Sequence, residues 1–199
     1  MKLKVTIGVA VTMVVMLVII SVNQYMSVNQ YQRWISDDLN NDLGAVSQGI
    51  LSNEEVLSDV VVAHEITTED AQLLERNAQY IYRLKTLQDF TVEMFNYKPS
   101  DFDHSPEPSS TELVSRLADE AQFISEEREG HLNEDDVTMI EKYLALHKQW
   151  AKHVNDYYPS ISSEGAGQTF FSDHENMVAE QEWVSFILDV KEETEGYNP

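Results

Sequence analysis

The N-terminal segment Val5–Val22 is a run of 18 residues without a charged side chain. At the helical rise it spans about 27 Å, close to the roughly 30 Å thickness of a bilayer's hydrocarbon core. Lys2 and Lys4 precede the run, and no basic residue occurs in the ten positions that follow it. Because positive charge marks the cytoplasmic side of a span, we predict that residues 1–22 are a transmembrane signal anchor with a cytoplasmic N-terminus. This segment would contact the lipid bilayer through residues 5–22.

Two alternatives to the anchor follow from the same segment. A cleaved signal peptide needs small residues at positions −3 and −1, and the nearby pairs, Ile19 with Ser21 and Tyr25 with Ser27, fit that need poorly. A core helix of a soluble protein would leave the basic flank and the unbroken apolar run without a purpose. No second apolar run of spanning length follows, so we expect an uncleaved, single-pass protein of the cell membrane.

The rest of the chain, residues 23–199, is strongly acidic. Of the 13 Lys and Arg residues, two lie in the anchor, which leaves 11 against 35 Asp and Glu residues, a formal charge of −24. Such a surface repels phosphate backbones, so we expect no nucleic-acid partner. The chain has no cysteine, which excludes disulfides, thiolate metal sites and a cysteine nucleophile. We expect one extracytoplasmic domain that is held together by packing alone.

Apolar residues in this domain recur at helical spacing, and strong alternating strand patterns are absent. The first stripe continues from the anchor as Val28, Tyr31, Ile35, Leu39, Leu43, Val46 and Ile50. We predict an all-α fold in which the N-terminal transmembrane helix continues into an antiparallel helical bundle of about four to five helices. The predicted helices run to about residue 50 and then over 52–65, 68–97, 109–130, 133–159 and 172–195.

Capping residues set these boundaries. The sequence Ser52-Asn53-Glu54-Glu55 has the form of a capping box, which predicts a helix break after Ile50. Thr67 or Thr68, Asn133, and the pairs Ser109 with Glu112 and Ser172 with Glu175 are the other predicted N-terminal caps. On the helix over 68–97, we expect one shared apolar face with a flank beside it. The face contains Leu73, Tyr80, Leu84, Leu87 and Met94, and the flank contains Leu74, Ile81 and Phe95.

One loop, at 98–109, invites a metal hypothesis. Oxygen-bearing side chains occupy positions 1, 3, 5, 7, 9 and 12 of an EF-hand pattern, namely Asp101, Asp103, Ser105, Glu107, Ser109 and Glu112. However, Pro106 stands at the position that normally needs glycine for a sharp turn. An ordinary solvated loop is the preferred interpretation, and we assign no metal ligand.

No other motif indicates chemistry. The histidines give neither an HExxH nor a Glu-x-x-His motif, and His147 falls on a core stripe, where a hydrogen-bonded structural role is simplest. The segment Gly165–Gly167 lacks the third glycine of a dinucleotide site, and GxSxG is absent. We therefore assign no catalytic, cofactor-binding or metal-binding residue and expect no cofactor.

The layout of a short basic N-terminus, one span and a helical outer domain resembles the outer half of bacterial receptor-type proteins. Because the resemblance covers only that half, without a second span, signal transduction would need a partner. We expect a membrane-anchored, non-catalytic interaction or sensing module with an unidentified protein partner. A membrane-anchored calcium-binding protein is the alternative, and a hydrolase without a recognisable motif is a further one.

Overall fold

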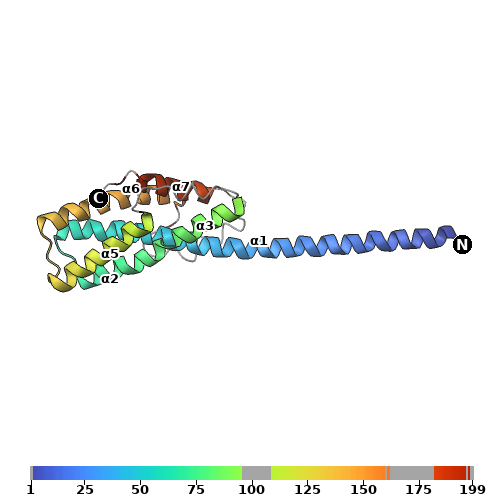
Figure 1. The fold of residues 1–199 in the computed structure, drawn as a ribbon, viewed down its shortest axis with the longest axis horizontal. Helices are drawn as coiled ribbons and strands as arrows, with labels where there is room; N and C mark the ends of the chain where they lie inside the picture. Colours follow the sequence, from blue (N-terminus) through green and yellow to red (C-terminus); the bar gives the residue numbers. More distant parts are fainter. Residues whose placement is uncertain (1, 96–108, 160, 162–181, 196, 198–199) are drawn as a thin grey trace.

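A computed structural model describes residues 2–95, 109–159, 161, 182–195 and 197. These residues form an all-α helical bundle (Figure 1), as the sequence predicts. The helices in chain order are α1 Lys2–Ala63, α2 Thr68–Ile81, α3 Arg83–Phe95, α5 Ser110–Glu127, α6 Glu134–Tyr157 and α7 Glu182–Glu195.

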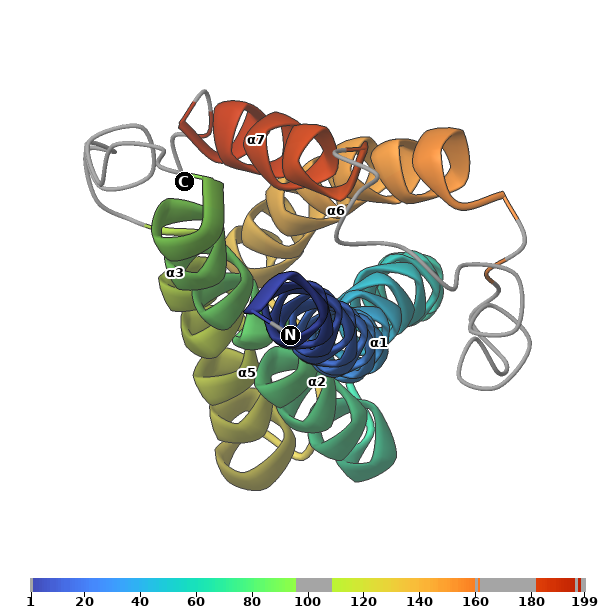
Figure 2. The same ribbon diagram turned by 90° about the vertical axis from the view of Figure 1, so that its right-hand side faces the viewer.

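The bundle is antiparallel, and α1 is its central element. Helix α1 runs outward from the N-terminus, α2 and α3 return along it, α5 runs outward again, and α6 returns (Figure 1). Helices α2, α3 and α6 pack directly on α1, whereas α5 packs on α2 and α7 packs on α6 (Figure 2). Each amphipathic helix thereby buries its apolar stripe against a neighbour.

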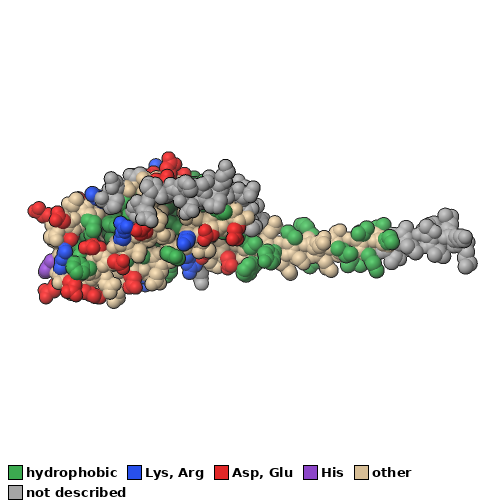
Figure 3. Space-filling view, in the orientation of Figure 1, with side chains coloured by type: hydrophobic (Ala, Val, Ile, Leu, Met, Phe, Trp, Pro, Cys, Tyr) green, Lys and Arg blue, Asp and Glu red, His purple; other side chains and the backbone are tan. Residues whose placement is uncertain are grey.

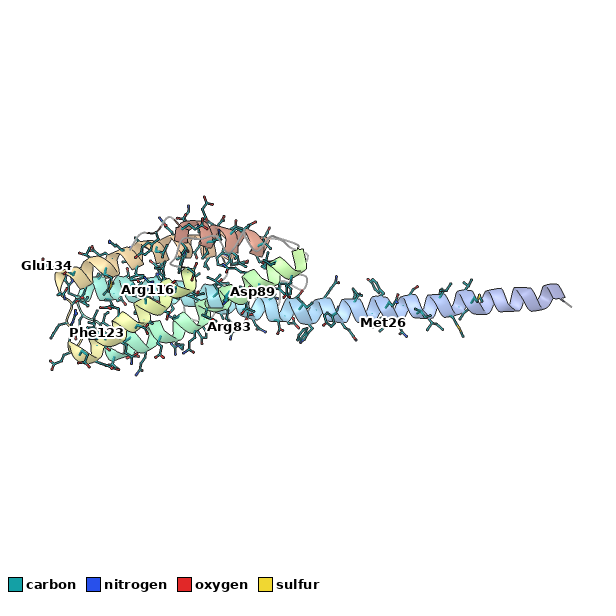
Figure 4. All side chains as sticks on the ribbon, viewed as in Figure 1. Met26, Arg83, Asp89, Arg116, Phe123 and Glu134 are labelled. Atoms are coloured by element: carbon teal, nitrogen blue, oxygen red, sulfur yellow. The ribbon has the colours of Figure 1, made fainter. Side chains whose placement is uncertain are left out.

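Helix α1 has 62 residues and is about 93 Å long at the helical rise. Its N-terminal part projects from the bundle (Figure 1). The described side chains of that part, from Met13 onward, are exposed; Met13 and Ile20, for example, are 64% and 52% exposed. Figure 3 shows no charged side chain on the described stretch of this projection, and Figure 4 places Met26 on it. By length and composition, α1 is the one described helix that could cross a membrane.

The predicted helix break after Ile50 is wrong, because α1 continues without interruption to Ala63. Ser52 does not cap a new helix, because it lies within α1, and the next residue, Asn53, is part of the core. It is 1% exposed and bonds to neighbouring helices in the core. Gly49 also lies within α1 and lets α2 approach closely: a Cβ at this position would lie 3.1 Å from the carbonyl oxygen of Asn77. Helix α1 ends at Ala63. The next residue, His64, turns the chain with a φ of 56°.

Four predicted caps lie in the described residues, and all but the one at Ser52 start helices. Thr67 caps α2 and Asn133 caps α6, each in a reciprocal capping box with the aspartate three residues later. Ser109 caps α5 by accepting a hydrogen bond from the backbone N–H of Glu112, without the reciprocal bond. The predicted Ser172 cap lies outside the described residues.

The predicted helix over 68–97 is two helices, α2 and α3, separated by Tyr82. Tyr82 keeps right-handed helical dihedrals, and a tighter bond from Lys85 N–H to the Tyr82 carbonyl follows it, so the chain direction is maintained. Leu84 and Leu87 are buried as predicted. The core face of α2, however, contains Leu74, Asn77 and Ile81, not the predicted Leu73 and Tyr80, which are only half-buried.

The two turns at the distal end of the bundle, opposite the projecting part of α1, are joined by backbone hydrogen bonds. Ile66 N–H donates to the Gly130 carbonyl at 2.9 Å, and Arg128 forms an ion pair with the buried Asp136 at 2.6 Å. Phe123, under the Arg128 guanidinium, and Glu134 mark this end in Figure 4. Gly130 has a φ of 82°, and a Cβ there would lie 2.4 Å from the Ile66 carbonyl oxygen.

This geometry predicts opposite effects at adjacent positions. Gly130→Ala should lower the free energy of unfolding by about 2–4 kcal/mol, because the methyl group meets backbone and the left-handed conformation is strained. Glu129 also has a positive φ, of 54°, but Glu129→Gly should raise that free energy by about 0.5–1 kcal/mol by relieving strain. Urea unfolding of the detergent-solubilised protein measures both values, and equal effects would contradict the turn geometry.

Candidate functional site

A chain of buried hydrogen bonds crosses the centre of the bundle. Asn77 of α2 donates both hydrogens of its Nδ2, to Ser52 Oγ at 2.8 Å and to Asn53 Oδ1 at 2.9 Å. Asn53 Nδ2 lies 3.1 Å from His147 Nε2, and His147 Nδ1 lies 2.9 Å from the Tyr143 carbonyl oxygen. The network therefore links α1, α2 and α6.

The protonation state of His147 follows from these partners. A carbonyl oxygen only accepts, so Nδ1 carries the hydrogen and donates to Tyr143, while Nε2 accepts from the Asn53 amide. The imidazole is fully buried, and burial lowers its pKa from 6.5 to about 4, against the opposing effect of the bond to Tyr143. The ring is thus a neutral connector at physiological pH. The predicted hydrogen bonding of His147 is confirmed, but the ring is fully buried, whereas its place on the stripe predicts only partial burial.

A groove follows the open side of α1 between that helix and the α2–α3 pair. It consists of three consecutive pockets with volumes of about 250, 470 and 500 Å³. Adjacent pockets share lining residues: Asp38 and Asp42 join the first two, and Gln48 and Tyr80 join the last two. We call them the proximal, middle and distal pockets, counting from the projecting end of α1.

The α1 side of this groove has a regular spacing. Eight lining residues are separated alternately by four and three positions, which places them on one face of the helix, and we call them the open stripe: Trp34, Asp38, Asn41, Ala45, Gln48, Ser52, Glu55 and Asp59. The stripe is about 37 Å long. It contains no basic side chain, and apart from Trp34 and Ala45 its side chains are polar or acidic.

The proximal pocket is mostly apolar. Its lining includes Trp34, Ile35 and Leu39 of α1 and Leu87 and Phe90 of α3, with the two aspartates at its edge. Trp34 is 60% exposed, and its ring meets that of Tyr31 edge-on at a centroid distance of 6.0 Å. Large apolar side chains are therefore accessible where α1 leaves the bundle.

The distal pocket is polar and has charges of both signs. Glu55 and Asp59 lie on its α1 side, and Arg76 lies on its α2 side. Ser52 and Asn77, which belong to the buried network, also line it. In the middle pocket, by contrast, Arg83 is already paired with Asp42 at 2.6 Å.

Other titratable groups in the described residues do not gather into a metal site. No group of three or more His, Asp or Glu side chains suited to an ion occurs there. His153 lies 3.7 Å from Asp189 and 3.5 Å from Glu193, and Tyr157 donates to Asp189 at 2.8 Å. These contacts join α6 to α7.

The EF-hand-like loop lies outside the described residues except for its last part. There, Ser109 caps α5 and Glu112 pairs with Arg116 on the same helix. The segment Gly165–Gly167 and two of the histidines, His104 and His174, also lie outside the described residues.

Sequence reasoning missed the network and the groove for different reasons. Asn53 lies at a core position of α1, in line with Val46, Ile50 and Leu57. A polar residue at such a position indicates a buried hydrogen bond, and this signal is present in the sequence. The groove depends on where α2 and α3 lie beside α1, and no local pattern encodes that placement.

Comparison with known proteins gives no match to this chain, whether with protein-family models, with characterised proteins or with solved structures. Function is therefore inferred from the geometry alone.

The buried His147 predicts a specific pH dependence. Between about pH 6.5 and 4, His147 is protonated in the unfolded chain but not in the folded one. The free energy of unfolding therefore falls as the pH falls through this range, and this histidine accounts for about 3 kcal/mol of the decrease. The substitution His147→Gln should remove this contribution to the pH dependence of the free energy of unfolding. The exposed His131→Gln is the matched control and should keep it. Chemical denaturation at successive pH values measures both, and identical slopes for the two variants would contradict the assignment.

Proposed function

We propose that this chain is a membrane-anchored, non-catalytic interaction module whose helical domain stands on the outer side of a cell membrane and docks a partner protein. The observation that carries the proposal is the continuity of α1. One helix of 62 residues begins in an apolar projection and ends in the core of the bundle. A domain built around such a helix has its position above the membrane fixed by the helix itself.

The charge distribution supports the anchor and its orientation. From Val5 to Gln32 the chain has no charged side chain, and 28 residues of helix span about 42 Å, the thickness of a bilayer with its headgroups. Tyr25, Tyr31 and Trp34 follow the apolar core of this segment, exposed on α1, where aromatic side chains favour the interface. Lys2 and Lys4 fit the cytoplasmic side.

The docking proposal rests on the proximal pocket and its place in the fold. If α1 is the anchor, this pocket opens next to the outer membrane surface, and its apolar lining can take a side chain from an adjacent membrane helix. Asp38 lines this pocket as well, whereas Asp42 is already paired with Arg83. The charge of Asp38 favours a partner with a basic residue close to that apolar side chain. We therefore propose a helix of a second membrane protein as the occupant.

A second copy of the chain fits this surface less well. Two anchored copies would associate in parallel about a two-fold axis, and such an interface places each patch against the same patch of the partner. Asp38, Glu55 and Asp59 of the open stripe would then meet their own copies, and repulsion between like charges opposes that pairing.

Single cysteines test the orientation, since the natural chain has none. A membrane-impermeant maleimide should label Glu69→Cys, an exposed position on α2, in intact cells. The same reagent should label Leu3→Cys only after permeabilisation, because this position would lie on the cytoplasmic side. Labelling of Leu3→Cys in intact cells would reverse the orientation, and its loss from the mature protein would indicate cleavage.

Photo-crosslinking in the native membrane tests the docking surface. A benzophenone amino acid at Trp34, Asp38 or Asn41 should give one product of the same added mass. The same group at Asp89, an exposed aspartate on the neighbouring α3 (Figure 4), should give none. Three results would overturn docking of a different protein. They are products at every position, no product at any position, and a product with twice the mass of the chain.

A further inference from the structure

We infer that the distal pocket binds a small zwitterion, a molecule that carries a carboxylate and an ammonium group close together. This site is separate from the proximal docking surface. The inference rests on three features of the pocket: unpaired charges of opposite sign on its two sides, a fixed polar floor, and a volume suited to a small molecule.

The charged side chains come first. Glu55 and Asp59 are four residues apart on α1, so they lie on one face of the helix, and Arg76 faces the same pocket from α2. Neither carboxylate nor the guanidinium forms an ion pair or a hydrogen bond with any residue that the structure describes. Arg83 in the next pocket differs, because Asp42 neutralises it. The distal pocket thus contains two carboxylates and a guanidinium that do not pair with one another.

The floor of the pocket is held in place by the core. Asn77 is 2% exposed, and both hydrogens of its Nδ2 are used in bonds to Ser52 and Asn53. Gly49 lets α2 lie against α1 directly beneath this point. Side chains that line a pocket and are fixed from below by buried partners are pre-organised, which lowers the entropy lost when a ligand binds.

The arrangement of charges selects the ligand class. A guanidinium binds a carboxylate through two parallel hydrogen bonds, and a pair of carboxylates holds an ammonium group. A simple anion would meet repulsion from Glu55 and Asp59, and a simple cation would meet repulsion from Arg76. A zwitterion satisfies both sides at once. The half-buried Leu73 and the largely buried Val56 offer apolar contact to a short side chain.

The size of the pocket agrees with this class. Its volume of about 500 Å³ lies in the lower half of the range for small-molecule sites. The pocket is also open to solvent along the groove, so a ligand can enter without movement of α1 or α2. Amino acids and amino-acid-like molecules are the chemical class that fits.

Binding is tested with the full-length protein in detergent micelles, by thermal unfolding followed by calorimetric titration. The probes are the individual α-amino acids at 10 mM. The best of them is compared with its amine analogue, which lacks the carboxylate, and its acid analogue, which lacks the amine. At least one amino acid should raise the Tm by several degrees, because a ligand bound only by the folded state stabilises it. Each single-charge analogue should bind at least tenfold more weakly.

Variants decide whether the distal pocket is the site. Arg76→Gln should weaken binding at least tenfold, as should the double variant Glu55→Gln with Asp59→Asn. The control is Glu141→Gln with Lys148→Gln, exposed charges on α6, which should leave the affinity unchanged. All of these side chains are exposed, so the Tm without ligand should stay close to that of the natural chain, and a matching helical circular dichroism spectrum checks the fold.

Two results would overturn the inference. One is the absence of a Tm shift with every amino acid at 10 mM. The other is a shift that Arg76→Gln leaves intact, which would place the ligand elsewhere. Because the measurement uses isolated protein, its outcome is independent of the crosslinking of a partner, and either can fail without the other.

Discussion

Burial of the apolar face of α1 between Leu39 and Val60 is the interaction on which the other helices depend. Leu43, Val46, Ile50 and Leu57 on this face are fully buried, and each contributes on the order of 1.5–3 kcal/mol relative to an exposed side chain. Helices α2, α3 and α6 cover it directly, and α5 and α7 pack on that first layer. Loss of this face would leave those helices without a common surface.

Apolar burial alone does not determine how far each helix slides along α1. The buried hydrogen bonds among Asn53, Asn77 and His147 supply that information, because they form only in one register. A net gain of about 0.5–1.5 kcal/mol per bond is modest, but each buried polar group without a partner would cost about 1–3 kcal/mol. Registers that separate these three groups are therefore excluded, as with single buried polar residues in coiled coils.

The same register builds the groove. With Asn77 bound to Ser52, the neighbouring residues of α2, Leu73, Arg76 and Tyr80, lie beside the open stripe of α1. The acidic side of the distal pocket therefore faces a basic one because of contacts in the core. The buried network thus positions the side chains of the groove, where we propose that ligand and partner bind.

Local signals were sufficient for the helix starts at Thr67, Ser109 and Asn133 and insufficient for the length of α1 and for the groove. The caps at Thr67 and Asn133 have short-range causes, and both were predicted correctly. Ser52 and Asn53 form the same kind of pattern, but burial against other helices outweighs capping there, so the predicted break is wrong. Leu73 and Tyr80 were assigned to the core face because apolar spacing does not distinguish a core from a groove. Only the packing of α1 against α2 shows whether a residue faces the core or lines the groove.

The central claim is that one uninterrupted helix connects the apolar projection to the core, and a distance across the predicted break tests it most directly. Spin labels at Gln24→Cys and Glu55→Cys, both exposed positions, would be measured by double electron–electron resonance in lipid nanodiscs. A continuous helix gives a narrow distribution centred near about 46 Å. A broad distribution at clearly shorter distances would mean that α1 bends or breaks between the apolar projection and the bundle, and would contradict this account.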